Sequence, residues 1–86
     1  MDTKETPLSR RLLSMRDARG WSRPDAVREM SRINKERGLL PPTLTVEGLR
    51  TCERGCRPSA IIMHELSILY GVDYRDLALT GLEGKR

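Results

Sequence analysis

Three side chains in the C-terminal half are of the types that bind zinc. Cys52 and Cys56 are four residues apart, and His64 follows eight residues later. Thiolates and imidazoles are zinc ligands, but a structural site needs four ligands, and this spacing matches none of the common arrangements. Cys52 also falls at a predicted core position. We therefore predict no metal site, two reduced cysteines, and a His64 side chain at or near the surface.

No other set of residues forms a recognisable catalytic arrangement. The chain has no glycine-rich phosphate loop, no Ser/His/Asp set in a supporting context, and no paired carboxylates that so small a domain could enclose. We predict that the protein is not an enzyme and uses no cofactor.

The charge balance favours a partner that carries phosphate. The 86-residue chain has 16 Lys and Arg against 12 Asp and Glu, a net charge of +4. An excess of cations on a small domain attracts phosphate, and arginine, the dominant cation here, forms bidentate bonds to phosphate and to guanine. No apolar run is long enough to cross a membrane, and the first residues do not form a secretory signal. We expect a cytoplasmic protein without a membrane partner.

Helices must position these residues. Hydrophobic residues make up 37% of the chain and aromatic residues only 3%, which suits helices packed on helices. Capping residues followed by apolar residues at helical spacing predict helices at about 7–19, 22–37, 45–54, 58–70 and 74–79. The expected fold is one compact all-α domain over residues 7–80. Residues 1–6 are expected to be a flexible segment, and residues 81–86 a flexible tail.

The order of caps, glycines and apolar residues resembles the Cro/phage-repressor-type (XRE) helix-turn-helix family over roughly residues 8–80. The matching residues are Leu12-x-x-Met15-Arg16, Gly20-Trp21-Ser22-Arg23, Leu49-x-x-Cys52-Glu53-Arg54-Gly55, Pro58 and Tyr70-Gly71-Val72. The resemblance implies a five-helix lambda-repressor-like domain of a bacterial transcriptional regulator. Such a domain binds double-stranded DNA in a sequence-specific way, at the nucleoid. The helix at about 45–54 would be its recognition helix in the major groove.

The resemblance also implies residue roles. Arg16 and Glu53 match a structural salt bridge between the first and third helices. The positions that match base-reading residues are Val46, Glu47, Gly48, Arg50 and Thr51. Their chemistry fits, because arginine binds guanine, glutamate accepts from cytosine, and valine contacts a thymine methyl group. We expect phosphate contacts from Arg23, Thr45, Arg54 and Arg57.

One departure from the family pattern is the long connection between the second and third helices. The family usually has a tight turn here, whereas this chain continues through Pro41-Pro42, which predicts an extended segment. We expect Leu39, Leu40 and Leu44 to seal the core. The insertion could alternatively bring the basic side of the second helix, at Arg28, Arg32 and Lys35, against DNA.

The fourth predicted helix is apolar around most of its girth, which indicates burial by more than one neighbour. We expect Met63, Leu66 and Tyr70 to face the core, and the surplus at Ile62 and Leu69 to meet the insertion or a second subunit, as in a homodimer. Trp21 is expected in the core, at the junction of the first two helices. A C-terminal effector domain in a longer chain is also compatible with the sequence. The alternative function is a protein-interaction module that docks a partner through this helix and the 39–44 loop.

Overall fold

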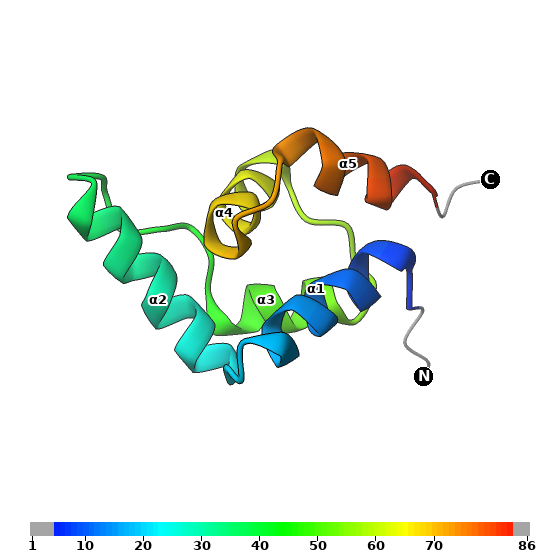
Figure 1. Cartoon of the computed structure of the whole chain (residues 1–86), viewed down its shortest axis with the longest axis horizontal. Coiled ribbons are helices and arrows are strands. Elements are labelled where there is room, and N and C mark those ends of the chain that lie inside the picture. Colours follow the sequence, from blue (N-terminus) through cyan, green and yellow to red (C-terminus); the bar gives the residue numbers. More distant parts are fainter. Residues whose placement is uncertain (1–4, 84–86) are drawn as a thin grey trace.

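Five helices and no strands make up the part of the chain that the computed structural model describes, residues 5–83 (Figure 1). The helices are α1 (Pro7–Ala18), α2 (Arg23–Glu36), α3 (Val46–Glu53), α4 (Ala60–Tyr70) and α5 (Tyr74–Glu83). The all-α, five-helix prediction is confirmed. The flexible ends predicted for residues 1–6 and 81–86 lie partly outside the described residues. Among residues 5–83, no helix is long and apolar enough to cross a membrane.

The helix starts follow local capping chemistry. At α1, the Thr6 hydroxyl accepts a hydrogen bond from the Ser9 N–H at 3.0 Å, and the Ser9 hydroxyl accepts one from the Thr6 N–H at 2.8 Å. Ser22 and Asp25 form the same reciprocal pair at the start of α2. Each pair satisfies N–H groups that have no partner within the helix. These starts agree with the predicted ones because the signal lies within four residues of sequence.

The end of α5 differs from the prediction. The helix was expected to end at about residue 79 but continues to Glu83, into the segment predicted as tail. Arg11 of α1 explains part of the extension, because its guanidinium donates to Asp76 at 2.9 Å and to Thr80 at 2.7 Å. These two acceptors are one helical turn apart, so the contact requires helical backbone through Thr80. Buried Leu77 holds the same helix against the core.

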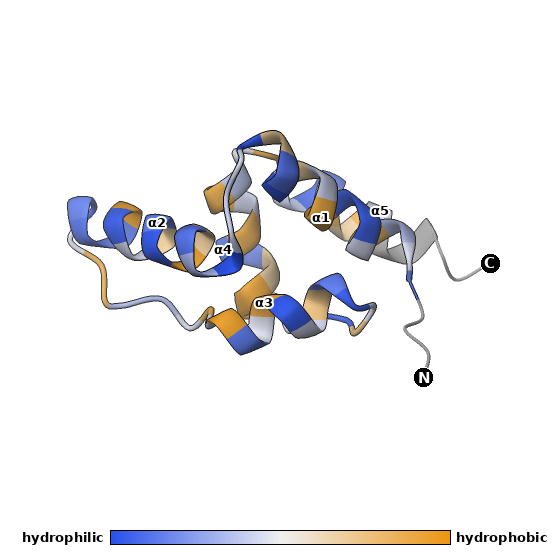
Figure 2. Cartoon of the chain, turned by 90° about the horizontal axis from the view of Figure 1, so that it is seen from below, coloured by the Kyte–Doolittle hydropathy of each residue, from blue (hydrophilic) through white to orange (hydrophobic). Residues whose placement is uncertain are grey.

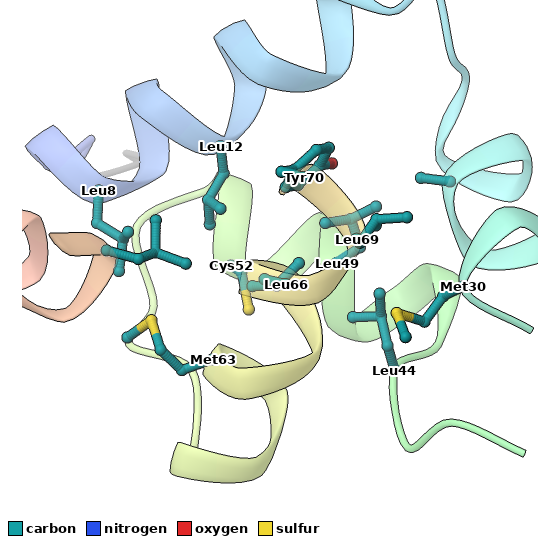
Figure 3. Packing of buried hydrophobic residues seen from close by; sticks show 12 residues of the cluster. Leu8, Leu12, Met30, Leu44, Leu49, Cys52, Met63, Leu66, Leu69 and Tyr70 are labelled. Atoms are coloured by element: carbon teal, nitrogen blue, oxygen red, sulfur yellow. The ribbon is translucent and has the colours of Figure 1, made fainter. Parts of the chain in front are cut away.

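The core consists of hydrophobic side chains from all five helices and from Leu44 in the segment before α3 (Figure 3). Helix α1 packs against α3 and α5, α2 packs against α3 and α4, and α4 packs against α5. As predicted, Met63, Leu66 and Tyr70 are buried. Figure 2 shows that α3 lies at the edge of this arrangement, so one of its faces is free for contacts outside the domain.

An aromatic cluster closes the junction of the first two helices. The Trp21 ring is half-buried, packs against the core as predicted, and stacks on Tyr70 with 6.3 Å between ring centroids. The guanidinium of Arg19 lies over both rings and donates to the carbonyl oxygen of Tyr70 at 2.8 Å. Burial raises the pKa of the Tyr70 hydroxyl to about 12. The phenol therefore stays neutral at physiological pH.

Two predictions about apolar side chains are wrong in part. Leu44 is buried, but Leu39 and Leu40 are 53% and 84% exposed and do not seal the core. On α4, Leu69 belongs to the core and Ile62 is half-buried against it, so neither is surplus surface. The large apolar side chain that α4 exposes is Ile61 instead. The girth of α4 is covered because α2 and α5 both pack on it.

Candidate nucleic-acid interface

Helix α3 has two faces of opposite character. Its inward face carries Leu49, Cys52 and Glu53, which are all buried. Its outward face carries Val46, Glu47, Arg50 and Thr51, which are all exposed. Four of the five residues predicted to read bases therefore share one accessible face. Gly48, the fifth, is only half-exposed.

Gly48 has a local structural reason. The Thr45 hydroxyl caps α3 by accepting from the Gly48 N–H at 2.9 Å. A Cβ at this position would lie 3.1 Å from that hydroxyl oxygen. The missing side chain thus leaves room for the cap, in addition to allowing an outside partner to approach the backbone closely. The Thr45 oxygen that was expected to contact phosphate already serves the cap.

The polar groups of the outward face are only loosely tied to each other. The Arg50 guanidinium lies 3.7 Å from the Glu47 carboxylate, and both side chains are exposed. An exposed pair of this kind contributes about 0–1 kcal/mol. The Thr51 hydroxyl donates to the carbonyl oxygen of Glu47 at 2.9 Å. Arg50 and Glu47 can therefore separate at little cost and turn towards a partner.

The inward face is anchored by Glu53, whose side chain is 1% exposed. Its carboxylate accepts from Arg16 Nε at 2.7 Å and from Arg16 Nη2 at 3.0 Å, so the expected salt bridge is present and bidentate. Arg16 also donates to the carbonyl oxygen of Trp21 at 2.8 Å. The hydrogen bond to Glu53 raises the pKa of the Arg16 guanidinium above its ordinary value. The pair joins α1 to the end of α3.

Arg23 has a role that the sequence did not indicate. Its Nε donates to the same Glu53 carboxylate at 3.0 Å, with 34% of the side chain exposed. Glu53 thus links α1, α2 and α3 through two arginines. Arg23 was predicted to hold phosphate, and in the free protein its Nε serves this internal link instead. The Arg23 position had suggested a phosphate contact because backbone N–H groups at the start of α2 can also meet an anion.

Cations elsewhere on the second helix are mostly compensated. Arg28 pairs with Asp25 at 3.3 Å, and Arg32 pairs with both Glu29 and Glu36. The basic side of α2 therefore carries little net charge. Arg54 and Arg57, which follow α3, are exposed and form no ion pair with another described residue. Two positive charges with no ion pair among residues 5–83 thus follow the end of α3.

The segment before α3 is held by two residues that sequence reasoning missed. Glu65 of α4 accepts from the N–H groups of Thr43 and Leu44, and Asn34 of α2 donates to the carbonyl oxygen of Leu40. A signal was present in each case. Asn34 follows Met30 by one turn on the apolar side of α2, and Glu65 is the single acidic residue of the otherwise apolar α4.

A shallow apolar groove lies on a different part of the surface. It has a volume of about 470 Å³, and Leu39, Ile61, Ile68 and Tyr74 form most of its lining. His64 borders it and meets the Tyr74 ring edge-on, with 5.5 Å between centroids. The groove is thus formed by α4, the start of α5 and the segment after α2. Of these, α4 and Leu39 belong to the alternative docking prediction, whereas α5 does not.

The cysteines and histidine do not come together as metal ligands. Within the described residues, no three His, Cys, Asp or Glu side chains form a group that could hold a metal ion. Cys52 is buried and Cys56 is exposed, and both thiols are free. Burial raises the pKa of the Cys52 thiol to about 11. Cys52 is therefore a neutral core side chain.

A thiol-reactive reagent should distinguish the two cysteines. At pH 8, we expect rapid modification of Cys56 and modification of Cys52 only after the protein opens, because the thiolate is the reactive form and Cys52 is both buried and protonated. Mass spectrometry of the native and denatured protein measures this. One rapid modification when native and two when denatured is the expected result. Two rapid modifications of the native protein would show that the end of α3 is not packed as described.

Comparisons with known proteins do not add to this picture. No family model matches the chain, and neither curated proteins nor solved structures give a significant match.

Proposed function

We propose that this protein is a sequence-specific, double-stranded DNA-binding domain of a bacterial transcriptional regulator, acting at the nucleoid. We place it in the Cro/phage-repressor-type helix-turn-helix family as a variant with a long connection between α2 and α3. The main support for the proposal is that α3 has one exposed polar face and one buried face. Its polar face is exposed, while Glu53 on its other face is fixed to α1 and α2 by Arg16 and Arg23.

The dimensions and chemistry of α3 support this function. An α-helix with its side chains is about 10–12 Å across, which fits the major groove of B-DNA, about 12 Å wide. Arg50 can bond to O6 and N7 of guanine, Glu47 can accept from the amino group of cytosine, and Val46 can contact a thymine methyl group. In this account Gly48 allows close approach, and Thr51 offers its hydroxyl oxygen and methyl group to a neighbouring base.

Phosphate contacts in this proposal come mainly from Arg54 and Arg57. Both follow the recognition helix, are exposed and lack an ion pair with another described residue. Arg23 and Thr45 would contribute through the exposed part of a guanidinium and through the start of α3. Such contacts orient the domain on the duplex and carry no base preference themselves.

Replacing Arg54 with alanine should weaken binding to all duplex sequences alike and reduce its salt dependence. Each lost phosphate contact makes the slope of log K against log salt concentration less steep by about 0.9. Titrations of a duplex by fluorescence anisotropy at several salt concentrations measure both quantities. Arg10→Ala is the matched control, because it removes the same charge from an exposed arginine that is already paired with Glu5. Equal slopes for the two variants would contradict the assignment of Arg54.

A second candidate function is docking of a protein partner. The observation that favours it is the apolar groove together with the exposed side chains of Leu39, Leu40 and Ile61. Exposed apolar surface of this kind is common at protein interfaces. A titration with nonspecific duplex DNA at low salt separates the two candidates. Salt-sensitive binding supports the first, and absence of binding supports the second.

A further inference from the structure

Residues 37–45, here named the connector, join α2 to α3. In Figure 1 the connector runs from the far end of α2 back to the start of α3. It ends at Thr45, the N-cap of α3. A connection of this length cannot fix the direction of the next helix by turn geometry alone, because each free residue adds backbone conformations. Side chains from elsewhere in the fold must therefore hold it.

The first half of the connector is held by Asn34 near the end of α2. The side-chain NH₂ group of Asn34 donates to the backbone carbonyl oxygen of Leu40 at 3.0 Å. The backbone carbonyl oxygen of Asn34 accepts from the Leu39 N–H at 2.8 Å. Pro41 and Pro42 follow directly. Because proline has a fixed φ angle, this part of the connector is stiff. Because proline has no N–H group, neither residue needs a hydrogen-bond acceptor for its backbone nitrogen.

The second half is held by one carboxylate. Glu65 of α4 accepts from the Thr43 N–H at 2.8 Å through Oε2 and from the Leu44 N–H at 2.7 Å through Oε1. Hydrogen bonds to a charged acceptor are stronger than those between neutral groups. The Leu44 side chain is buried in the core, and the next residue is the cap of α3. Glu65 thus fixes the chain to α4 immediately before α3 begins.

We propose that Glu65 is a positioning residue for DNA recognition. It orients α3 by holding the connector to α4, without contacting DNA itself. This inference rests on the function proposed above. For a variant that lacks the Glu65 charge, we expect a change in DNA affinity opposite in direction to the change expected from charge alone. Removing a negative charge from a DNA-binding domain should strengthen binding to a polyanion, whereas loss of the positioning contact should weaken it.

The test is Glu65→Gln. Glutamine keeps the shape but replaces one acceptor oxygen with an NH₂ donor, which faces one of the two N–H groups. We expect about tenfold weaker binding to a duplex that the wild-type protein selects from a random pool, equivalent to about 1.4 kcal/mol. We expect an unchanged salt slope, because no phosphate contact is lost. Amide hydrogen exchange at Thr43 and Leu44 should become faster.

Glu36→Gln is the matched control. It removes the same charge from an exposed glutamate that directly precedes the connector but whose carboxylate pairs with Arg32 of α2. It should bind DNA as well as the wild type or slightly better. Binding by Glu65→Gln that equals or exceeds that of Glu36→Gln, measured where circular dichroism shows both folded, would overturn the proposal. If Glu65→Gln does not fold, Asn34→Ala tests the other connector contact by the same readouts, with the same expected losses.

Different results would contradict the proposed DNA binding and the positioning role of Glu65. If the wild-type protein binds no duplex at low salt, the proposed function is wrong, and with it the role of Glu65 in recognition. If the wild type binds and Glu65→Gln leaves affinity unchanged, only the positioning role is wrong. Amide exchange at Thr43 and Leu44 is independent of DNA and reports whether the carboxylate holds the connector in the free protein.

Discussion

Replacing Glu53 with glutamine should lower the free energy of unfolding by about 3–5 kcal/mol, the range found when one partner of a buried ion pair is removed. The effect is large because the side chain is 1% exposed and serves both Arg16 and Arg23. Glutamine leaves the Arg16 guanidinium, itself largely buried, without its counter-charge. A domain of 86 residues has a total free energy of unfolding of about 4–13 kcal/mol, so this loss is a large share of the total.

Chemical denaturation followed by circular dichroism measures this loss. Glu47→Gln is the control, because it makes the same change on the same helix at a side chain that is 77% exposed. It should alter stability by less than about 0.5 kcal/mol. Equal midpoints for the two variants would mean that Glu53 does not hold α3 in place.

Replacing Arg50 with alanine should relax the preference for one base pair by about 1–3 kcal/mol, the contribution of a bidentate contact to guanine. Its side chain is 49% exposed and its contact with Glu47 is long, so stability should change little. Affinities for duplexes that differ at one base pair at a time measure the preference. Arg75→Ala, at an exposed site on α5, removes the same charge and should leave the preference intact. A preference in Arg50→Ala equal to that of the wild type would show that Arg50 does not read bases.

The sequence predicted those features whose cause is local. The starts of the helices follow from caps such as Thr6 and Ser22, and the end of α4 follows from Gly71, whose φ of 68° suits glycine. The two faces of α3 follow from helical periodicity. The link between Arg16 and Glu53 spans 37 positions and was expected only through the family resemblance.

The features that were missed depend on contacts between distant segments. Glu65 stands out as the single acidic residue of α4. Its partners Thr43 and Leu44 could still not be predicted, because they contribute backbone N–H groups that any residue except proline carries. The sequence also does not distinguish Leu44, which is buried, from Leu40, which is exposed, since both lie in an extended segment without helical period. Arg23 was not predicted as the second partner of Glu53, because its position at the start of the second helix fits a phosphate contact equally well.

The central claim is that the outward face of α3 reads duplex DNA. Selection of bound sequences from a pool of random duplexes by the wild-type protein at low salt tests it most directly. We expect enrichment of a short motif that contains a guanine, and loss of the preference for this guanine when the selection is repeated with Arg50→Ala. A wild-type selection whose products remain as random as the starting pool would contradict it.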